Sequence, residues 1–532
     1  MLPRSAGILI PLFSLRTRDD LGRGEILDLV QIIDFALSMG HRVIQLLPLD
    51  ETGPEELSPY SAMSVMAIDP MYISIRDLPG VGRVVQGRAR AAVGKGRFVP
   101  RAIIRREKFV LLERAYRATR ARGGRDESPD RDAFVKANSY WLHDYTLFRA
   151  LKERFNWTSW DTWPAEIARR EPAALETARR ELAEQIEMYS YWQFIAHRQW
   201  SQMRVYASSR GAFIGGDLAF SPGHDSAEVW ANQDEFDLTR TVGAPPDGFN
   251  PKGQRWGLPL PNWNNMRAAG FKVLRARARH AASLYDLIRI DHVVGLYRTF
   301  NFGSDPDAPG VFTPANEEDE LHQGEEVIRT IKQEAAAADL IAEDLGTVPP
   351  WVRESLTRLG VPGYKVMQWE RDWHGDESFF SPSSYPELSL ATTGTHDTEP
   401  LTVWWRAQPI AERERLLHAL RLEGKVNPRR LLEKSAREAI LTALYAAPSR
   451  LVMIPIQDLF GWSARINRPG TVGDSNWTYR LPLTLERMRR SKAIQSDVTR
   501  IREIANGSGR FKAEDASPKP QLSSPVTSSG EA

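Results

Sequence analysis

Short apolar runs with the length and composition of buried β-strands recur along the whole chain, and most of them end abruptly in polar residues. Amphipathic patterns with helical periodicity lie between several of them, for example at 25–40, 324–338 and 429–447. Buried strands that alternate with helices favour a parallel sheet covered by helices on both faces. Eight such runs therefore predict an α/β fold of the closed (β/α)8 TIM-barrel type. The runs are residues 6–12, 42–49, 212–220, 287–295, 339–346, 363–369, 388–397 and 450–458.

Two connections between these runs are too long for simple crossovers. Residues 81–205 are rich in Arg and Glu with a helical pattern, which predicts a mainly helical subdomain inserted between a first barrel part (1–80) and the remainder (206–505). Residues 221–286 contain a long loop full of turn residues and tryptophans, and such loops in compact domains are commonly functional. The final segment, 506–532, has few large apolar residues, so we expect a disordered tail there.

Composition narrows the class of protein. The chain has no cysteine, which excludes a disulfide framework, Cys-ligated zinc and thiol catalysis, and suits a reducing cytoplasm. Its net charge of +2 gives no indication of a nucleic-acid or anionic membrane partner. The apolar start at 6–15 is too short to span a bilayer. The segment 83–108 holds nine Lys/Arg against one Glu, but without an aromatic platform it is better interpreted as a solvated helical face.

Three of the predicted strands end in carboxylates. The fourth run supplies Asp291, the fifth Glu343 and the seventh Asp397. Catalytic side chains of such barrels lie at the C-terminal ends of the strands, so these three can meet there. A pair of carboxyl groups, one attacking and one protonating, is what glycosidic-bond chemistry needs. One acidic residue at a strand end is more often a helix cap or an ion-pair member, but three at corresponding ends favour a shared site.

The segments around these carboxylates are similar to known motifs. "RIDHVVGLYR", "IAEDLGTVP" and "GTHDTEP" resemble the central motifs of the 4-α-glucanotransferases (amylomaltases or disproportionating enzymes), which are relatives of the α-amylases. Further matching motifs, such as "LLPLDETGPEELSPYS", "GAPPDGFNPKGQRWGLP" and "RINRPGTVGDSNWTYRL", surround them in the expected order, so the resemblance covers about residues 6–485. It implies a TIM barrel with long loops over its C-terminal face.

The resemblance also implies an activity. Segments of α-1,4-glucan would move between maltooligosaccharides through a covalent glycosyl-enzyme, with retention of configuration. Maltooligosaccharides and α-1,4-glucans would be donors and acceptors, and glucose an acceptor. We expect no metal or organic cofactor, no nucleic-acid or membrane partner, and a cytoplasmic monomer or homodimer.

Carried over residue by residue, the resemblance makes Asp291 the nucleophile and Glu343 the general acid/base. Asp397 would be the third carboxylate, which hydrogen-bonds sugar hydroxyls and favours the distorted ring. Arg289, two residues before Asp291, should point the same way along the strand and favour its ionised form.

The loop 243–258 corresponds to the flexible lid of the family. Alternatives stay open for three residues: Trp256 could be a core anchor of a long loop, Asn467 an ordinary turn asparagine, and His292 a structural histidine facing away from Asp291 in a regular strand. The residues that the resemblance assigns to substrate binding are Tyr60, Asp217, Asp247, Gln254, Trp256, Arg289, His396 and Asn467.

Three segments depart from the usual pattern. Thr398–Glu399–Pro400 stands where Asn-Asp-Thr is commoner, 219–223 reads "AFSPG" in place of "PIYVA", and 305–326 replaces a Trp-containing loop. All three lie near the expected cleft, so they bear on chain-length and acceptor preference. The competing functions are a hydrolytic α-glucosidase or amylase and a catalytically silent glycan-binding protein. Products from maltotriose separate them, because only a transferase makes longer oligomers.

Overall fold

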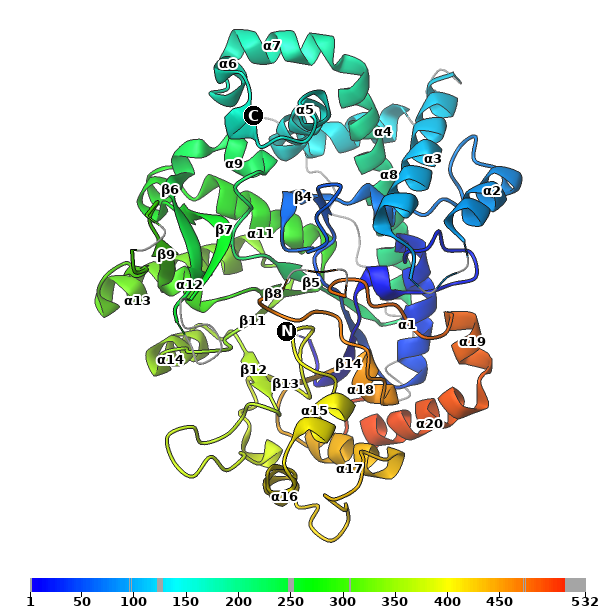
Figure 1. The fold of residues 1–532 in the computed structure, drawn as a ribbon, viewed down its shortest axis with the longest axis vertical. Coiled ribbons are helices and arrows are strands. Elements are labelled where there is room, and N and C mark those ends of the chain that lie inside the picture. Colours follow the sequence, from blue (N-terminus) through cyan, green and yellow to red (C-terminus); the bar gives the residue numbers. More distant parts are fainter. Residues whose placement is uncertain are drawn as a thin grey trace, which may run out of the picture.

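Eight parallel strands form a closed barrel at the centre of the molecule (Figure 1). The computed structural model describes residues 2–94, 96, 98–121, 128–246, 253–305, 308–471, 473 and 475–511. Neighbours in the barrel follow chain order, and the Ala342 N–H donates to the Pro362 carbonyl (2.9 Å) where the last pair, β11 and β12, meets. The predicted (β/α)8 barrel is confirmed. Its strands are β1 (Ser5–Leu9), β2 (Val43–Gln45), β5 (Phe213–Leu218), β8 (Leu287–Ile290), β11 (Asp339–Ala342), β12 (Gly363–Val366), β13 (Ser389–Thr392) and β14 (Leu451–Pro455).

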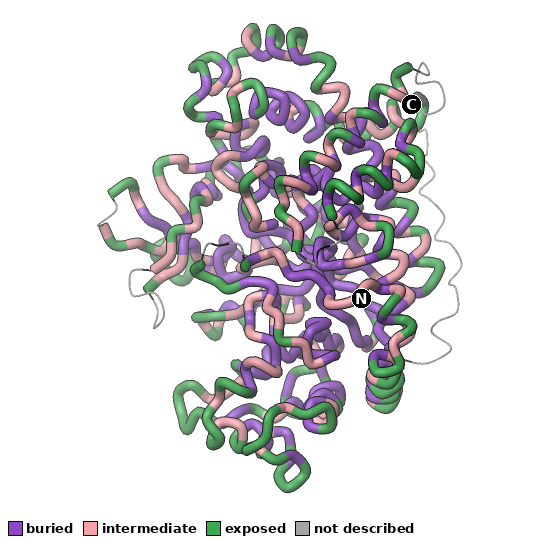
Figure 2. The backbone as a smooth tube through the Cα atoms, turned by 45° about the vertical axis from the view of Figure 1, so that its right-hand side comes forward, coloured by how far each residue is buried: buried purple, intermediate pink, exposed green. Residues whose placement is uncertain are grey.

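The barrel strands are the most deeply buried part of the chain (Figure 2). All five residues of β14 are buried, as expected for an apolar strand with a sheet neighbour on each side and helices outside. Each strand lies within one of the predicted runs, except that β1 begins one residue earlier. The surrounding helices include α1 (Leu29–Ser38), α11 (Lys272–Leu284), α13 (Glu317–Glu334), α14 (Pro350–Arg358), α17 (Lys434–Tyr445) and α20 (Lys492–Gly507).

Helix α13 begins well before its predicted start at residue 324. The Asn316 side chain accepts a hydrogen bond from the Asp319 N–H (3.0 Å), and four acidic residues occupy the first turn. Both features stabilise a helix N-terminus, because they satisfy free N–H groups and complement the helix dipole. The segment 305–326, which stands in place of the Trp-containing loop of the usual pattern, is therefore helical from Glu317 onward.

The region predicted to be a helical insertion is helical throughout its regular structure, and it occupies the upper part of the view in Figure 1. Its last helix, α8, continues past residue 205 to Ser209 and leads directly into β5. The insertion is thus joined to the barrel by a helix that belongs to both. The helices are α2 (Arg83–Val93), α3 (Arg101–Ala121), α4 (Ser128–Ala137), α5 (Ser139–Arg154), α6 (Ala165–Ala168), α7 (Pro172–Glu181) and α8 (Ala183–Ser209).

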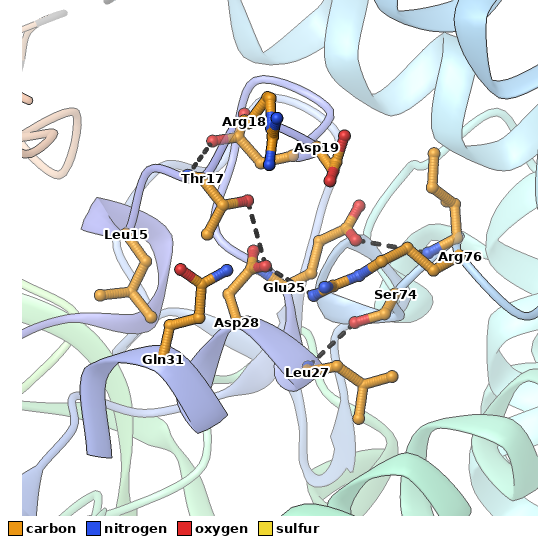
Figure 3. Close-up of polar contacts among 12 residues, drawn as sticks. Leu15, Thr17, Arg18, Asp19, Glu25, Leu27, Asp28, Gln31, Ser74 and Arg76 are labelled. Atoms are coloured by element: carbon orange, nitrogen blue, oxygen red, sulfur yellow. Dashed lines mark hydrogen bonds and ion pairs between the residues drawn. The ribbon is translucent and has the colours of Figure 1, made fainter. Parts of the chain in front are cut away.

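A buried charge cluster ties the insertion to the loop that follows β1. The Lys108 ammonium of α3 lies 2.5 Å from the Glu25 carboxylate and 2.6 Å from the Ile73 carbonyl oxygen. Asp28 accepts a hydrogen bond from the Glu25 N–H (2.9 Å) and pairs with Arg76 at 2.8 Å (Figure 3). The side chains of Lys108, Glu25 and Asp28 are each 1% exposed. This cluster therefore connects helix α3, the segment 73–76 and the loop that follows β1.

A second, antiparallel sheet stands beside the barrel. It contains β6 (Phe236–Ala244), β7 (Gln254–Pro261), β9 (Thr299–Phe302) and β10 (Val311–Thr313). The prediction of a long loop within 221–286 is wrong for residues 236–244 and 254–261, because β6 and β7 pair there as a hairpin. The predicted lid, 243–258, includes the paired residues Gly243, Ala244, Gln254 and Arg255. Gly253 has a φ of +72°, and a Cβ at Gly243 would lie 1.8 Å from the Gln254 carbonyl oxygen, so both glycines are required by the close pairing. Residues 247–252, including Asp247, lie outside the described residues.

The chain remains packed beyond the predicted start of the tail at residue 506. Helix α20 ends at Gly507, and the buried Arg510 guanidinium donates to the carbonyl oxygens of Tyr445 (2.8 Å), Ala447 (2.7 Å) and Ser449 (2.9 Å). The rest of the predicted tail, 512–532, lies outside the described residues. In the described part of the chain, no helix combines the length and apolarity needed to cross a membrane.

Candidate active site

One arginine joins the carboxylates at the C-terminal ends of β8 and β11. Asp291 directly follows β8, and Glu343 directly follows β11. The Arg289 Nη1 atom lies 2.8 Å from the Asp291 Oδ1 atom, and its Nη2 atom lies 3.9 Å from the Glu343 Oε2 atom. The prediction that Arg289 and Asp291 point the same way is confirmed. The two predicted catalytic carboxyl groups therefore face a common, buried guanidinium.

Asp217 is the third acidic partner of this guanidinium. It lies opposite Arg289 in the parallel register of β5 and β8, so the sheet itself brings the two side chains together. The Arg289 Nη1 atom is 2.8 and 2.7 Å from the two Asp217 carboxylate oxygens, and the Tyr60 hydroxyl donates to Asp217 at 2.7 Å. Asp217 is fully buried, and its charge is balanced within this network.

Glu343 sits in an environment that favours its protonated form. Burial raises the pKa of Glu343 to about 8, although Arg289 acts to lower it. Its carboxyl oxygens accept hydrogen bonds from the backbone N–H groups of His292 (2.8 Å) and Leu345 (3.2 Å), which fix the orientation of the group. The side chain is 13% exposed. A carboxylic acid that keeps its proton at neutral pH can act as a general acid.

Asp397 lies in the loop after β13, and its environment favours the ionised form. Burial acts to raise its pKa, but His396 and the hydrogen bond from Asn467 outweigh burial and lower the pKa of Asp397 to about 2. The His396 Nε2 atom lies 3.2 Å from the Asp397 Oδ2 atom, and the Asn467 Nδ2 atom donates to the Asp397 Oδ1 atom at 2.6 Å. Asp397 is 37% exposed and stays a carboxylate.

The departure from the usual motif after Asp397 closes a tight turn. The Thr398 hydroxyl accepts from the Thr395 N–H (2.9 Å) and donates to the Thr395 carbonyl oxygen (3.0 Å). A Cβ at Gly394 would lie 2.2 Å from this hydroxyl, so the glycine is needed for the approach. The substituted motif thus keeps a rigid turn around His396 and Asp397.

An aromatic cluster connects the two halves of the site. The rings of Tyr60 and His396 are stacked with centroids 5.4 Å apart, and the Trp477 ring lies 5.8 Å from each of them. Tyr60 also donates to Asp217, so the cluster links the Asp217–Arg289 network to His396 and Asp397. Trp477 is missing from the predicted site; its one sequence signal is its place in the turn-rich motif "GDSNWTYRL".

Trp256, in the predicted lid segment, contacts the turn that follows Asp291, the candidate nucleophile. The Trp256 ring on β7 lies edge-on to His292, with centroids 4.8 Å apart, and Phe220 lies 5.6 Å away on another side of His292. The expectation of a regular strand through His292 is wrong, because β8 ends at Ile290 and His292 has a φ of +45°. Burial lowers the pKa of His292 to about 4, so its ring is neutral. The predicted Gln254 lies beside Trp256, whose indole N–H donates to it (3.4 Å).

Comparison with known proteins identifies the family. A family model described as 4-alpha-glucanotransferase matches residues 10–484. The chain belongs to the 4-alpha-glucanotransferase family. The 4-alpha-glucanotransferase of Chlamydia caviae is 31% identical over 93% of this chain and 94% of that protein, and that of Thermus thermophilus is 32% identical over 90% and 95%.

A solved structure agrees with this assignment. The amylomaltase from Streptococcus agalactiae in complex with acarbose covers 96% of this chain and 100% of its own, with 26% identity and a TM-score of 0.82. The activity of this chain is therefore that of a 4-α-glucanotransferase, which transfers α-1,4-glucan segments with retention of configuration, and its substrates are α-glucans.

A large groove of this glucanotransferase opens next to the lid. Its volume is about 720 Å3, and Trp256, Gly257 and Leu258 form one wall. The opposite parts of the lining come from the loop before β4 (Ala62–Ile68), from the C-terminal end of α5 and from residues 223–225. Trp256 lines this groove and also contacts His292, the residue after Asp291.

Proposed function

We propose that Asp291 is the nucleophile of the glucanotransferase and that Glu343 is its general acid/base. The observation that carries this assignment is the shared guanidinium. Arg289 stabilises the charge of Asp291 at 2.8 Å, while it is too far from Glu343 (3.9 Å) to offset the effect of burial there. Burial thus favours the protonated acid at Glu343, whereas Asp291 lies within hydrogen-bond distance of the guanidinium. A retaining glycosidic reaction requires one carboxyl group as acid and a second as nucleophile.

The first half-reaction uses both groups. The Asp291 carboxylate attacks the anomeric carbon of the donor, the bond from that carbon to the leaving oxygen breaks, and Glu343 gives its proton to this oxygen. Asp397 stays ionised and accepts hydrogen bonds from hydroxyls of the same sugar, which favours the flattened, positively charged ring of the transition state. Asn467, His396, Tyr60 and Asp217 hold this subsite.

The second half-reaction returns the enzyme to its starting state. A 4-hydroxyl of the acceptor glucan attacks the same carbon, its proton passes to the Glu343 carboxylate, and the bond to Asp291 breaks. Two inversions give net retention. The geometry of Trp256, between His292 and the groove, supports an acceptor chain that lies along the lid and keeps water from the intermediate.

Several finer assignments stay predictions. Asp247 and Gln254 would each add a polar contact to the acceptor. Glucose as an acceptor, a cytoplasmic location and a monomeric or homodimeric state follow from the family resemblance and from composition alone.

Substitution of the nucleophile tests the proposal. Asp291→Asn should lower the turnover of maltotriose by at least about 1,000-fold, since no glycosyl-enzyme can form, while the melting temperature stays near that of the wild type. Chromatography of the products after incubation with maltotriose measures both glucose and longer oligomers. Asp130→Asn, at an exposed carboxylate of helix α4 in the helical insertion, is the matched control. Near-normal transfer by Asp291→Asn would refute the assignment.

A further inference from the structure

Arg465 contacts both loops that carry the Asp397 half of the site. Its Nε atom donates to the Asn467 carbonyl oxygen at 2.5 Å, and its Nη2 atom donates to the Asp397 carbonyl oxygen. Asn467 in turn donates to the Asp397 carboxylate and, through its backbone N–H, to the His396 carbonyl oxygen (3.3 Å). One guanidinium therefore fixes the distance between the carboxylate and the amide that orients it.

The third partner of this guanidinium is the Glu399 carboxylate. The Arg465 Nη1 atom lies 3.5 Å from the Glu399 Oε1 atom, and the Gln368 side chain donates to the Glu399 carbonyl oxygen at 3.3 Å. The side chains of Arg465 and Glu399 are 24% and 35% exposed, so the pair lies at the protein surface of the site and not in the core. Glu399 belongs to the segment 398–400 that departs from the commoner motif, and it lies two positions from Asp397.

We propose that Arg465 and Glu399 form a positioning pair that sets the orientation of Asp397 and Asn467 for the transition state. The guanidinium contacts two backbone carbonyl groups and the Glu399 carboxylate, so its effect on the reaction passes through Asp397 and Asn467. A planar fork with donors in fixed directions can serve three acceptors at once, whereas a lysine ammonium cannot keep the same three directions. The inference rests on the proposed role of Asp397.

The pair predicts a defect in the chemical step and not in the fold. Arg465→Lys should lower kcat for maltotriose about 10-fold or more, with a smaller change in KM and with a melting temperature close to that of the wild type. Arg465→Ala should have a still lower kcat than Arg465→Lys. Adding about 50 mM guanidinium chloride should raise the kcat of Arg465→Ala by at least about threefold, because the vacated position is accessible to solvent. Sodium chloride at the same concentration should restore nothing.

Matched variants separate positioning from a general effect of charge. Arg415→Lys alters an exposed arginine that pairs with Glu412 at 2.8 Å on α16 (Ile410–Ala419), and it should leave kcat unchanged. In a double-mutant cycle, Glu399→Gln should cost less than Arg465→Lys, and the double variant should be no worse than Arg465→Lys alone, since coupled residues are not additive. If Arg465→Ala does not fold, the kcat of Arg465→Lys and the double-mutant cycle still test the proposal.

Two outcomes would overturn the inference in distinguishable ways. A folded Arg465→Lys variant with kcat within twofold of the wild type, beside an inactive Asp397→Asn variant, would refute the positioning pair and leave the role of Asp397 intact. An Asp397→Asn variant with near-normal kcat would refute both. Additive effects of Glu399→Gln and Arg465→Lys on kcat would show that Glu399 is not part of the positioning pair.

Discussion

Glu343 and Asp397 share one barrel mouth but differ in what surrounds them. Glu343 meets backbone N–H groups and a guanidinium at 3.9 Å, and burial raises its pKa to about 8. Asp397 meets the His396 ring and the Asn467 amide, and these contacts lower its pKa to about 2. The proposed acid and the proposed permanent anion are thus distinguished by their immediate neighbours.

The raised pKa of Glu343 predicts the basic limb of the pH profile. The first half-reaction needs the protonated acid, so kcat/KM for maltotriose should fall as the pH rises through about 8. Glu343→Gln should lose about 100- to 10,000-fold with maltotriose and lose the basic limb as well. Initial rates between pH 5 and 10 measure both effects.

A donor with an activated leaving group provides the control. The departure of fluoride from maltosyl fluoride needs little protonation, so Glu343→Gln should still form the glycosyl-enzyme from it at a rate close to that of the wild type. If Glu343→Gln were equally impaired with both donors, Glu343 would have another role.

At the scale of elements, the barrel and the lid differ in how far the sequence determines them. Each barrel strand lies in a local apolar run, and Asp291 and Glu343 directly follow two of these strands, β8 and β11, so the sequence alone locates both residues. The β6–β7 hairpin pairs residues across a Gly/Pro/Trp-rich segment, and its partner β9 lies far along the chain. Such long-range pairing leaves no periodic signal in the sequence.

The same distinction applies to single residues of the site. The contact between Arg289 and Asp291 follows from strand alternation. By contrast, the left-handed His292 and the packing of Trp477 against Tyr60 depend on loops that meet only in the folded chain.

Trp256 provides a test of the lid hairpin. If its ring shapes the acceptor path against His292, Trp256→Ala should raise the share of hydrolysis over transfer by about threefold or more, because water then reaches the intermediate. Trp256→Phe keeps an aromatic ring and should retain most of the transfer activity. Product ratios from maltotriose at equal conversion measure the effect.

The alternative for Trp256 predicts a different result. A tryptophan that only anchors the hairpin to the core would lower the melting temperature by several degrees on truncation to Ala, with the ratio of hydrolysis to transfer unchanged. Thermal unfolding and product analysis of the same two variants therefore distinguish an acceptor wall from a structural anchor.

At the scale of the whole molecule, the helical insertion and the barrel are joined by a buried ion pair. Lys108 of α3 and Glu25 of the first barrel loop are both 1% exposed. Burial raises the pKa of Glu25, and Lys108 opposes this effect. Removing one partner leaves an uncompensated buried group, which costs far more than removing an exposed pair.

Lys108→Met should therefore destabilise the protein by about 3–5 kcal/mol at pH 8, where Glu25 must either ionise without a partner or take up a proton. The folded state of this variant then binds more protons than the unfolded state, so its stability deficit should shrink as the pH falls from 8 to 5. Urea unfolding at both pH values measures the change. Arg120→Met breaks the exposed pair with Glu184 and should cost at most about 1 kcal/mol at either pH. Equal losses in the two variants, or a deficit in Lys108→Met that does not change with pH, would show that the buried pair does not couple the insertion to the barrel.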